Sequence, residues 1–128
     1  MSTHLFVYGT LMRGEERDGL VAHLPATPAS VRGQLWRVPA GYPALYLDPA
    51  GIEIRGELLQ LENESILMVL DLYEGVSEGL YSREVVPITV RGTKKTAWVY
   101  VMSRAQLRIA GCQPLKTDDW RTVSPKQG

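Results

Sequence analysis

Residues 5–14, "LFVYGTLMRG", form an apolar run that breaks at Gly9 and carries a second glycine at Gly14. This glycine spacing opens a phosphate-binding P-loop, but Glu15 and Glu16 occupy the positions where that loop needs Lys and Ser or Thr. Two carboxylates would repel a triphosphate, so nucleotide hydrolysis is excluded. Two interpretations stay open: backbone N–H groups after Gly9 bind an anion, or the segment is a plain β-turn.

A second candidate lies at the end of a predicted helix over Glu64–Glu74. Asn63 is placed to cap this helix, and Gly75 is placed to end it. An α-helix advances about 100° per residue, which aligns Asp71 with Glu64 and Met68, near the solvent edge.

The same periodicity places Glu74 on the apolar face, in line with Ile66, Leu67 and Leu70. Desolvation and the negative end of the helix dipole would both raise the pKa of this carboxyl. A carboxylate with a raised pKa in a partly dry pocket suits a general acid and base. The alternative is that the helix frays at Tyr73, so that Glu74 simply reaches water.

The remaining polar candidates carry weaker signals. Glu57 is a second possible base, although a carboxylate on the polar face of a strand is the simpler interpretation. Three tyrosines, Tyr8, Tyr81 and Tyr100, fall on three predicted strands. They either line one cavity or are core residues with a polar tip.

No metal-binding pattern is present in the sequence. His4 and His23 lack metal-ligand spacing, and Cys112 is a lone thiol for which an idle, buried state is the simplest interpretation. We therefore expect an activity that needs neither a metal ion nor a cofactor.

These candidates must be positioned by a sheet with few helices. Strands are predicted over His4–Tyr8, Val31–Val38, the segment entered by "GYPAL" (41–45), Ile52–Leu61, Tyr81–Val90 and Thr96–Met102. Turns are expected at "DPAG" (48–51) and at "RGTKK" (91–95), a hairpin loop, and a short helix is expected over residues 15–24. Gly33 marks a bulge or a close approach, Gly56 is a second strand glycine, and Trp120 anchors the tail.

Strands outnumber crossover helices in this pattern, which disfavours a doubly wound parallel sheet. We predict an α+β fold, a small mixed β-barrel-like sheet with few helices, in one domain over residues 1–128. The 128 residues contain 45% apolar and 22% charged side chains, an ordinary globular mixture.

Charge and composition limit the classes of binding partner that the sequence favours. Lys plus Arg and Asp plus Glu number 14 each, which disfavours a nucleic-acid partner. The sequence shows no secretory signal and no apolar run near the ~20 residues that cross a membrane. A single cysteine fits a reducing compartment. We therefore expect a cytoplasmic protein with no membrane partner.

Six segments together resemble the γ-glutamylcyclotransferase-like family. They are "VYGTLMRG" (7–14), "GYPAL" (41–45), "RGELLQL" (55–61), "LDLYEGV" (70–76), "YSREVV" (81–86) and "AWVYV" (97–101). The resemblance spans residues 5 to about 102 and leaves the tail, residues 103–128, unplaced. It implies a small barrel-like fold with its cavity at the "YGTL" loop.

The resemblance also implies roles for individual residues. Tyr8, Gly9, Thr10 and Leu11 would form the substrate-binding loop, and Glu74 would be the proton acceptor. We add Tyr81 as a further substrate-binding residue. The expected substrate is a small γ-glutamyl or related acyl-amine compound, whose cyclisation releases 5-oxoproline. Two alternatives stay open: a non-catalytic module that binds a small acidic metabolite, and a related amide-cleaving lyase or transferase.

Overall fold

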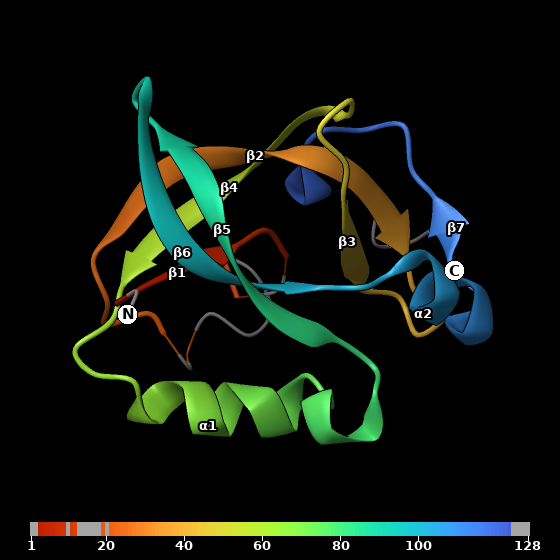
Figure 1. Ribbon diagram of the computed structural model, residues 1–128, viewed down its shortest axis with the longest axis horizontal. Coiled ribbons are helices and arrows are strands. Elements are labelled where there is room, and N and C mark those ends of the chain that lie inside the picture. The colour runs from red at the N-terminus through yellow and green to blue at the C-terminus, as the bar shows by residue number, and fades with distance from the viewer. Residues whose placement is uncertain (1–2, 10, 13–18, 20, 124–128) are drawn as a thin grey trace.

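A computed structural model describes residues 3–9, 11–12, 19 and 21–123 (Figure 1). Its strands are β1 (His4–Val7), β2 (Ala26–Arg37), β3 (Pro43–Leu47), β4 (Ile52–Gln60), β5 (Ser82–Val90), β6 (Thr93–Val101) and β7 (Gln113–Pro114). Its helices are α1 (Ser65–Tyr73) and α2 (Arg104–Ala110), with the short 3₁₀ turns η2 (Val76–Glu78) and η3 (Trp120–Thr122).

Five of these strands close into a barrel. They follow the order β2-β4-β1-β6-β5, and the pairing of Ser30 with Thr89 joins β2 back to β5. All neighbouring strands are antiparallel except β1 and β6, which are parallel with Leu5 opposite Trp98. The strands β3 and β7 both extend the sheet beside β2. The predicted α+β fold with a small mixed barrel is therefore confirmed.

The central strand β1 has the burial that its unbroken apolar sequence predicts. Leu5, Phe6 and Val7 are all buried, because both faces of this strand are covered. β2 begins at Ala26, five residues before the predicted Val31, because its pairing with β4 extends over residues 26–33.

Strand glycines mark places where two backbones come close together. A Cβ atom added at Gly56 would lie 2.2 Å from the carbonyl oxygen of Val7. One added at Gly33 would lie 2.5 Å from the carbonyl oxygen of Tyr46, so the close approach predicted there is confirmed. Only glycine allows these strands to pack at such a short separation.

The hairpin between β5 and β6 is tighter than predicted. Its turn consists of Arg91 and Gly92 alone, with φ angles of 51° and 78°. Two consecutive positive φ angles define the type I′ turn, whose twist matches that of paired strands. Residues 93–95, which the sequence placed in the loop, therefore belong to β6, and the longer loop was wrong.

The helix α1 lies along the outside of the barrel, beneath β5 and β6 in Figure 1. The Asn63 side chain accepts a hydrogen bond of 2.8 Å from the Ser65 N–H, although Glu64 is the residue at the N-cap. At the other end Gly75, with φ of 65°, adopts the left-handed conformation that ends a helix. The predicted helix is thus confirmed, one residue shorter at each end.

Outside the barrel, the predicted helix at 15–24 and the predicted role of Trp120 have different outcomes. Residues 21–24 form a turn rather than helix, and the rest of the predicted helix at 15–24 lies largely outside the described residues. The tail forms α2 with a capping box between Ser103 and Gln106. Trp120 is 9% exposed and lies beneath the Arg37 guanidinium, which agrees with its predicted role as an anchor. In the described part of the chain, no helix is long and apolar enough to cross a membrane.

Candidate active site

A cavity of about 330 Å³ opens between the tip of β1, the start of β3 and the end of α1. The structure brings most of the predicted site residues to its wall. The lining residues are Phe6, Val7, Tyr8, Gly9, Leu11, Tyr42, Pro43, Tyr73, Glu74, Leu80, Tyr81 and Tyr100. Thr10 lies outside the described residues. Tyr8, Tyr81 and Tyr100 therefore do line one cavity, although Tyr8 directly follows β1 and Tyr81 directly precedes β5, and only Tyr100 lies within a strand. The functional role of each residue is still a prediction.

Glu74 reaches this cavity from the C-cap of α1. Its backbone N–H donates to the Leu70 carbonyl at 2.8 Å, so helical geometry persists up to this residue. Leu67 and Leu70 are buried against the barrel, as the predicted apolar face requires. Because Glu74 continues that face, its side chain is directed to the cavity rather than to the outer surface of the helix.

Gly9 fits closely against the start of β3. A Cβ atom at this position would lie 2.5 Å from Cγ of Pro43. The Gly9 carbonyl accepts the Met12 N–H at 3.0 Å, which turns the chain at the end of β1. The glycine therefore lets the tip of β1 pack against Pro43 at one side of the cavity.

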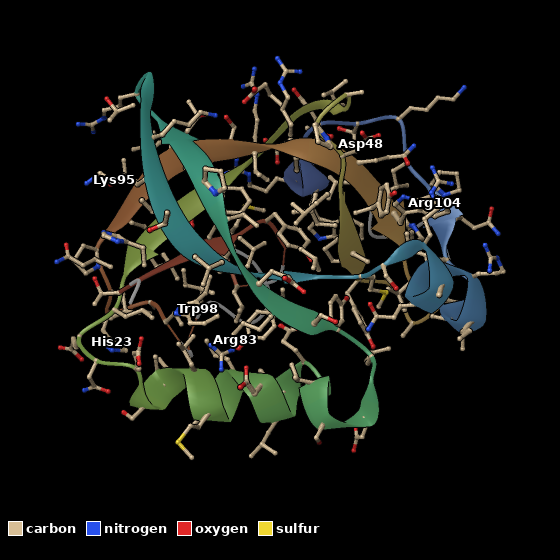
Figure 2. The ribbon with its side chains drawn as sticks, in the orientation of Figure 1. His23, Asp48, Arg83, Lys95, Trp98 and Arg104 are labelled. Atoms are coloured by element: carbon tan, nitrogen blue, oxygen red, sulfur yellow. The ribbon has the colours of Figure 1, made fainter. Side chains whose placement is uncertain are left out.

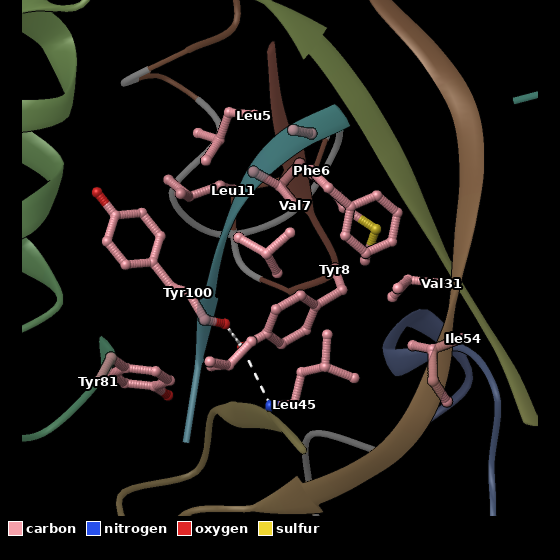
Figure 3. Close-up of a cluster of buried hydrophobic side chains, with 14 of the residues drawn as sticks. Leu5, Phe6, Val7, Tyr8, Leu11, Val31, Leu45, Ile54, Tyr81 and Tyr100 are labelled. Atoms are coloured by element: carbon pink, nitrogen blue, oxygen red, sulfur yellow. Dashed lines mark hydrogen bonds between the residues drawn. The ribbon is translucent and has the colours of Figure 1, made fainter. Parts of the chain in front are cut away.

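Hydrogen bonds from buried tyrosine hydroxyls fix part of the cavity wall, and Figure 3 shows those of Tyr8. The Tyr8 hydroxyl donates to the Tyr100 carbonyl at 2.6 Å and accepts the Leu45 N–H at 3.1 Å. The Tyr81 hydroxyl donates to the Pro43 carbonyl at 2.6 Å. Burial raises the pKa of both phenols well above the ordinary value, and the negative charge of Glu74 adds to the effect. These phenols therefore stay neutral and act as fixed hydrogen-bonding groups.

The two hydrogen bonds of Tyr8 lead to a stability prediction. Tyr8→Phe leaves a buried carbonyl and a buried N–H group without their partner, and we expect the free energy of unfolding to fall by about 1–3 kcal/mol. Urea denaturation measures this change. The control is Tyr46→Phe, because the Tyr46 hydroxyl makes none of the hydrogen bonds recorded among the described residues. Equal stabilities for the two variants would contradict the prediction.

The Asp71 side chain is 26% exposed, which agrees with its predicted place near the solvent edge. Its carboxylate is nevertheless bonded to the sheet, which the sequence did not predict. Its two carboxylate oxygens accept hydrogen bonds from Arg83 at 2.7 and 2.9 Å. The Tyr100 hydroxyl donates to the same carboxylate at 2.7 Å. The Arg83 guanidinium also stacks 4.3 Å from the ring centre of Trp98, as Figure 2 shows above α1. Sequence reasoning missed this group because its members meet only in the folded chain.

This network shifts the titration of Asp71. Burial acts to raise the pKa of its carboxyl, but the bonds from Arg83 and Tyr100 outweigh burial and hold the pKa below its ordinary value. A lowered pKa in the folded state means that Asp71 stabilises the fold fully above its unfolded value of about 3.9. This contribution is lost as the pH falls through the folded-state pKa.

We therefore expect a pH-dependent effect of Asp71→Asn. At pH 7 the variant should unfold with about 1–2 kcal/mol less free energy than the wild type, because the charged pairing is lost from a partly exposed site. The difference should narrow as the pH falls below about 4 and through the lowered pKa of folded Asp71, because the wild-type carboxylate then takes up a proton. Thermal unfolding of the wild type and of Asp71→Asn at pH 7, 5 and 3 measures this difference in stability. A difference that stays constant over this range would show that the carboxylate charge contributes nothing.

The other candidates lie apart from the cavity wall. Glu57 forms an ion pair with Arg121 at 4.0 Å, and His23 lies 3.7 Å from Glu62. Cys112 is buried, and burial raises the pKa of its thiol. Among the described residues, no group of three or more His, Cys, Asp or Glu is placed to hold a metal ion.

Comparison with known proteins identifies the family. The chain matches the family described as gamma-glutamyl cyclotransferase, AIG2-like, over residues 5–122, and it belongs to that family. The match includes most of the tail that the sequence resemblance had left unplaced. No curated protein matches the chain.

Solved structures share the fold. YkqA from Bacillus subtilis is similar with a TM-score of 0.73 and 25% identity, over 94% of this chain and 40% of YkqA. The chain thus spans less than half the length of that relative. An AIG2-like protein from Mus musculus has a TM-score of 0.65 and 24% identity, over 78% of this chain and 76% of its own. A protein named gamma-glutamyl cyclotransferase has a TM-score of 0.68 and 19% identity, over 100% of this chain and 91% of its own.

Proposed function

We propose that this protein is a cyclotransferase-type enzyme that cyclises γ-glutamyl compounds, with Glu74 as general acid and base. The observation that supports this most directly is the meeting of two separate elements at one cavity. Glu74 from the end of α1 lines the same space as Tyr8, Gly9 and Leu11 from the tip of β1. Membership of the gamma-glutamyl cyclotransferase, AIG2-like family supports the same reaction class.

The reaction is an intramolecular acyl transfer. The α-amine nitrogen of the γ-glutamyl group attacks the side-chain carbonyl carbon of the same group, which forms a five-membered ring. The bond from that carbon to the partner amine then breaks, giving 5-oxoproline and the free amine. A cavity that holds the substrate in the folded conformer lowers the entropic part of the barrier, since both reacting atoms belong to one molecule.

Glu74 would carry one proton through the whole cycle. The α-amine is nucleophilic only when deprotonated, and its pKa of about 8 calls for a base of suitably raised pKa. The Glu74 carboxylate would accept that proton during attack. The protonated carboxyl would then donate it to the leaving amine, so the enzyme returns to its starting state. The second proton, which the attacking nitrogen loses as it becomes the ring amide, would end on the released amine, which leaves as an ammonium ion.

The tip of β1 would bind the anionic part of the substrate. Backbone N–H groups around Gly9, Thr10 and Leu11 would hold the substrate carboxylate or the developing oxyanion, where prearranged donors contribute most. Tyr8 and Tyr81 would form the wall that confines the glutamyl group, since their hydroxyls are held by Leu45, Tyr100 and Pro43.

The direct test is release of 5-oxoproline. Purified protein would be incubated with γ-glutamyl-alanine, γ-glutamyl-ethylamide and γ-glutamyl-p-nitroanilide, and 5-oxoproline would be measured by mass spectrometry. We expect release from at least one compound, and we expect that release to survive a chelator because a carboxylate suffices for the proton transfer. Binding of these compounds without turnover would favour a non-catalytic module. Loss of activity with chelator, reversed by added metal, would overturn the mechanism.

A further inference from the structure

A network of hydrogen bonds, through the side chain and the backbone of Tyr100, connects the two elements that form the cavity. It runs from Arg83 to Asp71, from Asp71 to Tyr100, and from Tyr100 to Tyr8. Tyr100 is the central member, because its hydroxyl donates to Asp71 while its backbone carbonyl accepts the Tyr8 hydroxyl. The reaction described above uses none of the Arg83, Asp71 and Tyr100 side-chain bonds.

Two members of this network, Asp71 and Tyr8, lie next to the proposed reacting groups in the sequence. Asp71 lies three residues before Glu74, so the two share the last turn of α1. Tyr8 directly precedes Gly9 at the tip of β1. Tyr100 on β6 thus joins the helix that carries the proposed base to the strand that carries the proposed anion-binding loop.

Apolar packing alone would not fix this geometry. Leu67 and Leu70 hold α1 against the barrel, but hydrophobic contacts are non-directional and allow a helix to slide or rotate by small amounts. The bonds from Arg83 to Asp71 are bidentate and charge-assisted, which fixes direction as well as distance. Stacking of Arg83 on Trp98 holds the guanidinium itself in place.

We propose that Asp71 and Tyr100 are positioning residues, which set the Glu74 carboxyl at its working distance from the tip of β1. This proposal rests on the proposed function of Glu74. Neither residue transfers a proton; each acts by fixing the last turn of α1. Displacement of a catalytic group by about 1 Å can lower a rate by about 10²-fold, so small movements of this helix are sufficient.

The test removes one bond without changing any charge. Tyr100→Phe keeps the ring and the backbone carbonyl but deletes the hydroxyl that donates to Asp71. With the panel compound that releases 5-oxoproline fastest, we expect kcat to fall about 10- to 100-fold while KM changes less than threefold. The control variants are Tyr46→Phe and Glu53→Gln, which alter a half-buried tyrosine and another Arg-paired carboxylate, both outside the cavity wall.

Combining Tyr100→Phe with a second substitution distinguishes a positioning role from a general loss of structure. Tyr100→Phe should lower kcat in the wild type but leave the residual rate unchanged in Glu74→Gln, because no proton-transferring carboxyl is left to position. The double variant Tyr100→Phe with Asp71→Asn should lose no more activity than the more damaging single variant, since both weaken the same network around Asp71.

The outcomes distinguish the two proposals. If Glu74→Gln abolishes turnover while Tyr100→Phe leaves kcat unchanged, the positioning role is wrong and the proposed function stands. The positioning role is also wrong if Tyr100→Phe lowers the rate equally in both backgrounds. If Glu74→Gln turns over at the wild-type rate, the proposed function fails, and the positioning role fails with it.

Discussion

Glu74→Gln is expected to leave a folded protein that still binds a γ-glutamyl compound but turns it over about 10²- to 10⁴-fold more slowly. Glutamine keeps the shape of the side chain and can still form hydrogen bonds, but it cannot accept a proton at neutral pH. Steady-state release of 5-oxoproline measures the loss. Glu84→Gln is the matched control, because Glu84 is exposed on β5 and lies outside the cavity wall. Wild-type turnover in Glu74→Gln would end the claim that this residue is the base.

The same variant separates a catalytic carboxylate from a structural one. If the helix dipole and desolvation both disfavour the charge of Glu74, the Glu74→Gln protein should melt at the same temperature as the wild type or slightly higher. A structural carboxylate would show the opposite sign, because its partner would be left without the opposite charge and stability would fall by about 1–3 kcal/mol. One melting curve beside the kinetic assay therefore decides between these roles.

The second large effect is expected at Gly56, where β4 lies beside its antiparallel partner β1. A methyl group there would lie 2.2 Å from the Val7 carbonyl oxygen and 2.7 Å from Cζ of Phe6. Backbone cannot swing aside as a flexible side chain can, so Gly56→Ala must separate the two central strands. We expect a loss of about 3 kcal/mol, at the upper end of what overpacking usually costs.

Urea denaturation measures the Gly56→Ala effect against a matched glycine. Gly19→Ala is the control, since an added Cβ there meets no atom within 4 Å and its φ is not positive. A Gly56→Ala protein as stable as Gly19→Ala would show that β1 and β4 can separate freely. The predicted result would also show that the close contact between Gly56 and Val7 fixes the position of the tip of β1, and with it the proposed anion-binding loop.

Local patterns were sufficient for much of the fold. An unbroken apolar run predicted β1, and helical periodicity placed Glu74 on the face that packs against the barrel. Periodicity did not reveal the partners of Asp71, because it describes one helix alone. The partners that bond to the Asp71 carboxylate are Arg83 and Tyr100, twelve and 29 residues later in the chain. No pattern within the helix carries that information, because the sheet supplies the partners.

The predicted length of the loop at Arg91 and Gly92 was wrong for a different reason. A run of polar residues suggested a loop, but strand pairing continues through Thr93, Lys94 and Lys95 as far as the turn itself. Exposed lysines are compatible with a strand whose outer face meets water, so polarity did not mark the end of the strand.

The parallel pairing of β1 with β6 has a consequence for the order of folding. β1 contains residues 4–7 and β6 contains residues 93–101, so most of the described chain lies between these two paired strands. Contacts of such long sequence separation carry a high loop-closure cost and form slowly. During synthesis, the first strand emerges long before the strand that completes its sheet. The tyrosine at its end cannot reach the carbonyl of Tyr100 until that later strand exists. The cavity is therefore incomplete in any nascent chain that has not yet reached Tyr100, and assembly of the barrel is also assembly of the site.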